Sequence, residues 1–191
     1  QTCALPILNN FATGNVTTSD ASSYVGGLVG INRLTISNSY STGNVTGPLG
    51  ATLGGLIGIN YSSLSYSYST GLVAGGSTTG SLVGKNDTGG TVAYSYALDQ
   101  LGLIGSGSSA SNSSSFSLSA FKVSSNFSNL SSNYWFQYDG STAPLLSSYL
   151  TPITITSTSP ATKVYDATNS VTITQTYSAT LDGSKIGRAH V

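Results

Sequence analysis

Few side chains in this sequence are of the types that do acid–base, nucleophilic or metal chemistry. The 191 residues include one Cys, one His, six Asp, six Lys and Arg together, and no Glu. Cys3 and His190 stand at opposite ends of the chain, and neither has a partner nearby in sequence. A lone thiol and a lone imidazole in these places predict neither a nucleophile nor a metal site.

The aspartates are widely scattered. A glycosidase needs two carboxyl groups about 5 to 9 Å apart, and a calcium loop needs acidic residues at short alternating spacing. Consecutive aspartates here are at least twelve residues apart and stand in turn contexts. Asp87 and Asp99 could approach across neighbouring rungs, but solvated turn residues are the favoured interpretation. The sequence predicts no catalytic residue, no metal ligand and no cofactor among Asp20, Asp87, Asp99, Asp139, Asp166 and Asp182.

The two termini resemble translated sequencing adapter. Residues 185–191 and residues 1–7 can be encoded by reverse-complementary DNA in shifted frames. We therefore expect both heptapeptides to be artefacts and the natural segment to run from Leu8 to Ser184. That segment keeps Arg33, Lys85, Lys122 and Lys163 against the six aspartates, a net charge of −2. It has neither the thiol nor the imidazole.

The composition excludes several classes of protein. Charged residues make up only 6% of the chain, too few for the basic face that binds nucleic acid. Good helix formers are scarce, whereas Ser, Thr, Asn and Gly make up about half of the residues. No run approaches the roughly 20 apolar residues of a membrane span. Because 38% of residues are hydrophobic, the chain is too apolar for a disordered tail. A β-rich protein remains.

The middle of the chain is a repeat with a period of about 28 residues. Gly26-Gly27-Leu28-Val29-Gly30-Ile31-Asn32 recurs at 54–60 and, in a decayed form, at 80–86. A second block, Ile36-Ser37-Asn38-Ser39-Tyr40, recurs at 64–68 and 92–96, and Phe11 marks an earlier copy. Each unit has two short strand-like runs, too few to close a core alone. We therefore expect a stacked parallel β-helix, or β-solenoid, over residues 8–105.

Stacking would place equivalent residues above one another at about 4.8 Å. The asparagines would form an amide ladder and the tyrosines an aromatic column. Glycines bracket each strand where the chain bends with positive φ or another backbone comes close. Tyr and Ser alternate, so they face opposite sides; which one faces inward stays open, although Ile36 shares the parity of Tyr40. The predicted structural residues are Gly27, Leu28, Gly30, Asn32, Tyr40, Gly43, Gly55, Leu56, Gly58, Asn60, Tyr68, Gly71, Leu82, Gly84, Asn86 and Tyr96.

These two blocks resemble the GLUG repeat of large bacterial surface and secreted proteins of the filamentous-haemagglutinin type. The resemblance covers roughly residues 10–105 and is clearest in the first two full copies. In the third copy Ser81 replaces a Gly and Lys85 occupies a hydrophobic position. The resemblance implies a parallel β-helix and a place on the bacterial cell surface or outside the cell.

Residues 106–150 are rich in Ser and then in aromatic residues, with Trp135 and Pro144-Leu145-Leu146 as anchors. The block resembles the segment that closes such repeat arrays, and we expect Trp135 to cover the open end of the solenoid. A glycan contact by Trp135 is the alternative to plain packing.

Residues 151–184 show strict alternation at Ile153 and Ile155 and at Val171 and Ile173, which is typical of half-exposed antiparallel strands. Thr162-Lys163-Val164-Tyr165-Asp166 resembles the opening of a YDG-type, or MBG-like, β-sandwich module. Ala167 departs from the Gly of that motif. We expect an incomplete antiparallel β-sandwich module here.

The sequence as a whole favours a non-enzymatic structural or adhesive fragment of a secreted or surface-displayed bacterial adhesin. Its expected partners are host or matrix glycans or proteins, together with further domains of the same polypeptide, and not nucleic acid or an inserted membrane. Two alternatives stay open. One is the repeat region of a surface protease, and the other is a β-helix enzyme that acts on polysaccharides.

Overall fold

A computed structural model describes residues 5–150, 154–158 and 177–180. Its contacts divide the chain into two units, residues 1–148 and 149–191. Helix in the described residues is limited to three short 3-10 segments, η1 (Ala120–Lys122), η2 (Ser124–Phe127) and η3 (Ser147–Tyr149). The protein is all-β, as the sequence predicted.

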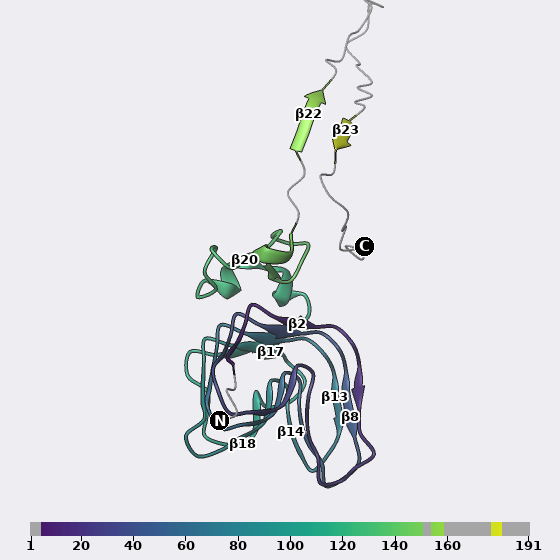
Figure 1. The fold of residues 1–191 in the computed structure, drawn as a ribbon, viewed down its shortest axis with the longest axis vertical. Helices are drawn as coiled ribbons and strands as arrows, with labels where there is room; N and C mark the ends of the chain where they lie inside the picture. The colour runs from purple at the N-terminus through teal and green to yellow at the C-terminus, as the bar shows by residue number, and fades with distance from the viewer. Residues whose placement is uncertain (1–4, 151–153, 159–176, 181–191) are drawn as a thin grey trace, which may run out of the picture. The chain divides into compact units, whose positions relative to one another are not determined.

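The first unit contains a parallel β-solenoid of about three turns (Figure 1). The first turn comprises β4 (Tyr24–Gly26), β5 (Val29–Asn32), β6 (Ile36–Ser37), β7 (Tyr40–Ser41) and β8 (Val45–Gly47). The second comprises β9 (Thr52–Gly54), β10 (Ile57–Asn60), β11 (Ser63–Ser65), β12 (Tyr68–Ser69) and β13 (Val73–Gly75). The third has β14 (Thr78–Gly80), β15 (Val83–Asn86), β16 (Thr91–Ala93) and β17 (Tyr96–Leu98). Five strands in each of the first two turns and four in the third replace the two predicted runs, because strands of two to four residues are too short to show a period of two.

Partial turns precede and follow the full turns, and the rungs stack into five parallel sheets. The additional strands are β1 (Ile7–Leu8), β2 (Phe11–Ala12), β3 (Val16–Thr17), β18 (Ile104–Gly107) and β19 (Ser114–Phe116). We name the sheets A (β1-β6-β11-β16), B (β2-β7-β12-β17-β19), C (β3-β8-β13), D (β4-β9-β14) and E (β5-β10-β15-β18). In each sheet the paired residues are equivalent positions of successive repeats, such as Ile57 with Val29 and with Val83.

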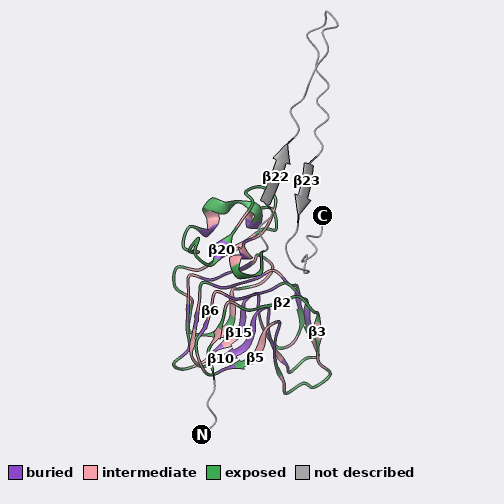
Figure 2. Ribbon diagram, turned by 45° about the horizontal axis from the view of Figure 1, so that its top comes forward, coloured by how far each residue is buried: buried purple, intermediate pink, exposed green. Residues whose placement is uncertain are grey.

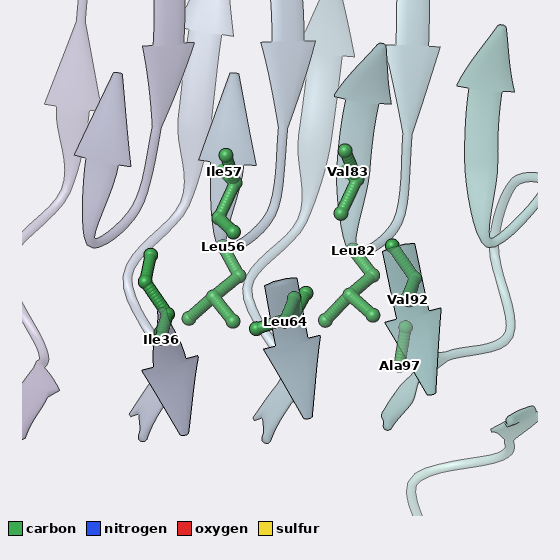
Figure 3. Close-up of a cluster of buried hydrophobic side chains, with 8 residues drawn as sticks. All are labelled: Ile36, Leu56, Ile57, Leu64, Leu82, Val83, Val92 and Ala97. Carbon is green, nitrogen blue, oxygen red and sulfur yellow. The ribbon is translucent and has the colours of Figure 1, made fainter. Parts of the chain in front are cut away.

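The inside of the coil holds the main hydrophobic core. Figure 3 shows its side chains from neighbouring rungs pointing toward one another between sheets E and A. The buried members are Ile36, Leu56, Ile57, Leu64, Leu82, Val83, Val92 and Ala97. A second cluster, with Val45 and Leu53 fully buried, contains residues of sheets C and D. Burial is most complete in the second rung, where all four residues of β10 are buried. Figure 2 shows buried residues gathered around β5, β10 and β15.

Sheets D and E lie close together, and glycine makes this possible. A Cβ atom on Gly58 would lie 2.5 Å from the backbone nitrogen of Val25 and 2.6 Å from the carbonyl oxygen of Gly30. Gly58 itself is not among the positive-φ residues. Of the two roles expected for this glycine, close backbone approach is therefore the one that the structure shows.

The remaining predicted segments are described only in part. β22 (Thr154–Thr158) and β23 (Tyr177–Thr180) pair in an antiparallel sheet with a register shift between Ile155 and Ser157. This two-stranded sheet is all that the structure describes of the expected sandwich module; residues 162–168 lie outside the described residues. So do Cys3, His190 and most of the two terminal heptapeptides, but Ile7 pairs with Ile36 in sheet A.

We predict that Gly58→Ala destabilises the solenoid by about 3 kcal/mol or more, because backbone atoms that cannot rotate away would clash with the new methyl group. The midpoint of urea unfolding measures the effect. Gly14→Ala is the matched control, since no atom lies within 4 Å of a Cβ there. Equal midpoints for the two variants would contradict the close-approach explanation.

Candidate functional site

The asparagines that end the strands of sheet E form a continuous amide ladder. Asn32 Nδ2 donates to Asn60 Oδ1 at 2.7 Å, and Asn60 Nδ2 donates to Asn86 Oδ1 at 2.9 Å. Asn60 Nδ2 also donates to the carbonyl oxygen of Ser62 at 2.8 Å. All three side chains are buried, and each amide is held both to the neighbouring rung and to its own turn. The ladder fixes the register of the rungs, because a shift would leave buried amides without partners.

A second, exposed ladder escaped the sequence analysis. Asn15 Oδ1 accepts from the Asn44 N–H, and Asn44 Oδ1 accepts from the Leu72 N–H, both at 2.9 Å. On the next rung the Gln100 side chain accepts from the Val73 N–H at 3.2 Å and donates to the Gly71 carbonyl at 2.8 Å. The recurring Gly-Asn-Val of the repeat was the available signal. Gln100 takes the place of a further rung at the edge of sheet C.

The tyrosine column lies on the outside of the coil wall. Tyr40 and Tyr68 stack with ring centroids 4.9 Å apart, and Phe11 stacks on Tyr40 at 5.2 Å. The flanking serines point inward: Ser41 Oγ donates to the carbonyl of Gly55 at 2.6 Å, and the equivalent Ala97 belongs to the inner core.

The sequence parity that linked Tyr40 to Ile36 breaks at the corner between sheets A and B. Asn38, Tyr66 and Tyr94 have φ of 48°, 50° and 48°, in the left-handed region. A left-handed residue changes the direction of the chain, so alternation does not carry across it. Tyrosine disfavours this conformation, and so the sequence did not indicate the corner. Tyr40, Tyr68 and Tyr96 are buried, but from the opposite side of the wall.

The segment that follows the repeats buries the tyrosine column of Tyr40, Tyr68 and Tyr96. We call residues 117–148 the closing segment. Phe121, Phe127, Trp135 and Leu146 form one hydrophobic cluster with Tyr40, Tyr68 and Tyr96. Two short strands, β20 (Trp135–Phe136) and β21 (Leu145–Leu146), pair antiparallel within it. Figure 1 shows this segment beside sheet B, outside the coil. The expectation that Trp135 covers the open end is therefore wrong, because contacts with three successive rungs require a side face.

Trp135 itself serves packing rather than ligand contact. Its side chain is 5% exposed, its ring lies 5.6 Å from that of Tyr68, and its Nε1–H donates to Asn38 Oδ1 at 3.2 Å. With only this small fraction exposed, the burial of Trp135 favours plain packing over the glycan contact. A depression of about 250 Å³ beside it is lined by Phe127, Trp135 and Pro144 and by neutral polar groups.

The other predicted structural residues follow the same rungs. Leu56 and Leu82 are fully buried in the inner core, and Leu28 packs against it. The glycines share one property: a Cβ on any of them would lie within 3 Å of a backbone atom of the same or a neighbouring rung. They are Gly27, Gly30, Gly43, Gly55, Gly58, Gly71 and Gly84.

The ionisable groups of the described residues are dispersed. No group of three or more His, Cys, Asp or Glu side chains there could hold a metal ion. Asp139 accepts from the Ser124 N–H at 2.7 Å, which lowers the pKa of that carboxyl. Asp87 and Lys85 form an ion pair at 2.9 Å. None of the helices in the described part is long and apolar enough to cross a membrane.

The fold and its ladders define a repeat protein of the parallel β-solenoid class. Within it, the family model of the GLUG motif matches residues 21–46, which run from the loop before β4 into β8. No curated protein and no solved structure has significant similarity to the chain.

We predict that Asn60→Leu destabilises the protein by about 2 to 5 kcal/mol, because it leaves the buried amides of Asn32 and Asn86 without ladder partners. Chemical denaturation measures the loss. Asn44→Ala, at the exposed ladder, serves as the control and should cost about 1 kcal/mol. A cost for Asn60→Leu no greater than that of the control would rule out the buried ladder as the main determinant of register.

A second prediction concerns pH. Burial, with a smaller contribution from nearby Tyr40, raises the pKa of Tyr68 well above its usual value of 10.0, and its hydroxyl donates to the Pro144 carbonyl at 2.6 Å. A group whose pKa is higher in the folded than in the unfolded state makes its full contribution to stability below the unfolded-state pKa. That contribution is lost as the pH rises toward the folded-state pKa. Above pH ~10 we expect the unfolding free energy to fall more steeply for the parent protein than for Tyr68→Phe. Parallel curves would show that Tyr68 does not control alkaline stability.

Proposed function

We propose that this chain is a structural and adhesive repeat region of a large protein that bacteria secrete or display on their surface. The observation that carries the proposal is the rung register: one residue pattern, whose copy at residues 21–46 matches the GLUG motif, recurs in register along a coil that exposes Ser, Thr, Asn and Tyr side chains. Such a coil holds identical side chains at strand spacing, which suits many weak contacts with a repetitive partner.

The finer parts of this proposal go beyond the motif match. They are a filamentous-haemagglutinin-like parent protein, an extracellular or cell-surface location, and host or matrix glycans or proteins as partners. The YDG-type module after residue 150 also belongs here; the antiparallel pairing of β22 with β23 is compatible with it. The main-chain ladders would be the mechanical element, and the outer faces the adhesive one.

The proposal predicts binding without turnover. The full chain should be retained on at least one immobilised polysaccharide or matrix protein, and avidity should increase when several copies are displayed on one bead. A reducing-sugar assay on the same polysaccharides should give no signal above the blank. Release of new reducing ends would instead favour the polysaccharide-acting enzyme, and failure to bind any surface would count against adhesion.

A further inference from the structure

Successive rungs place charged and aromatic side chains together at the corner that follows sheet E. Arg33, Tyr61 and Asp87 come directly after the buried ladder asparagines. The Tyr61 N–H donates to the Asn32 carbonyl and the Asp87 N–H to the Asn60 carbonyl, both at 2.9 Å. These hydrogen bonds stack the three residues in one column.

Lys85 adds a second cation to this corner. Its position pairs with Ile59, and Ile59 pairs with Ile31, so a lysine stands where the two preceding rungs carry isoleucine. Tyr61 follows Asn60, the residue that pairs with Asn86 of the Lys85 strand, and Tyr24 begins β4 of sheet D. Both rings stay accessible, with 40% of Tyr61 and 43% of Tyr24 exposed. We call Arg33, Tyr61 and Lys85 the basic corner.

Arg33 is free to bind an anion. Its Cζ lies 5.7 Å from the centre of the Tyr61 ring, and the residue is exposed. No carboxylate of the described residues forms an ion pair with it. A guanidinium presents a planar fork that matches a carboxylate with two parallel hydrogen bonds, and stacking on an aromatic ring orders that fork without using its donors.

Lys85 is charged, and its ion-pair partner Asp87 can be replaced by a ligand carboxylate. Its hydrogen bond and charge interaction with Asp87 raise the pKa of the Lys85 ammonium. The side chains of Lys85 and Asp87 are 40% and 26% exposed, and an ion pair with this much solvent contributes little to stability. A ligand carboxylate can therefore replace that of Asp87 at small cost.

We propose that the basic corner binds a carboxylated polysaccharide of the uronic-acid type. Arg33 and Lys85 lie two rungs apart, about 10 Å along the coil, so a chain with regularly spaced carboxylates can reach both. Tyr61 lies between them and offers an amphipathic ring to the sugar. Two cations beside one carboxylate are too few to neutralise a run of phosphates, which favours a polysaccharide over nucleic acid. The proposal rests on the adhesive role proposed above and names its ligand class.

Binding of the full chain to fluorescent oligogalacturonate, measured by anisotropy, tests this site. We expect binding that weakens about tenfold between about 0.05 and 0.5 M NaCl, and a loss of about tenfold or more in the double variant Arg33→Gln/Lys85→Gln. Lys122→Gln removes one positive charge, half of what the double variant removes, from the exposed Lys122 of the closing segment and should leave affinity unchanged. Equal thermal unfolding of all variants confirms that each one is folded.

Asp87→Asn gives a sharper readout. It removes the carboxylate that competes for Lys85, so affinity for oligogalacturonate should rise about two- to fivefold. Affinity that is insensitive to the double variant, or that falls in Asp87→Asn, would overturn the site. So would equal or tighter binding to a neutral xylo-oligosaccharide or to single-stranded DNA of the same length.

The site and the adhesive role can fail separately. If the chain without substitutions is retained on another polysaccharide or on a matrix protein but does not bind oligogalacturonate, the ligand proposed for the basic corner is wrong and the adhesive role stands. If the protein is retained on no surface and binds no oligosaccharide, both proposals fail.

Discussion

The structure depends on the register in which each rung lies against the one before it. Equivalent residues meet their own copies, so a side chain is tolerated inside the wall only if it can pair with itself. Asparagine meets this condition because its amide both donates and accepts, and Asn60 does so toward both neighbours. Isoleucine, leucine and valine meet this condition through dispersion contacts between stacked side chains in the inner core. Glycine meets it where sheets D and E leave no room for a side chain.

The wall of the coil has two buried sides, and they are made differently. The inner side is filled by the repeats themselves. The outer side of sheet B is covered by the closing segment, whose Phe121, Phe127 and Trp135 contact tyrosines from three rungs. Repeats and closing segment therefore form one folded unit, in agreement with the division of the chain near residue 148. The other outer faces stay open to solvent. They carry repeated side chains such as Asn15 and Asn44, whereas the corner after sheet E carries Arg33, Tyr61 and Asp87 on successive rungs.

The sequence predicted the solenoid, its period and the pairing of equivalent residues, because these follow from repetition alone. The buried amide ladder could be predicted for the same reason. The number of strands per turn could not, since segments such as Tyr40–Ser41 are too short to show alternation. The inward or outward direction of the tyrosines was also out of reach, because it depends on a left-handed corner that Tyr66 and Tyr94 adopt against their preference. The place of Trp135 depended on that direction. The basic corner combines residues from three rungs that share no repeated type.

The lateral position of the closing segment has a mechanical consequence. The hydrogen bonds between rungs run along the axis of the coil, so tension along that axis would load them directly and let the rungs peel away one after another. The closing segment spans this direction, held by the Tyr68 hydroxyl on Pro144 and the Trp135 indole on Asn38. Separating two of these rungs therefore also requires breaking the contacts between the closing segment and sheet B. The closing segment thereby distributes tension over several rungs. The force at which the coil opens is then not set by the weakest pair of rungs alone.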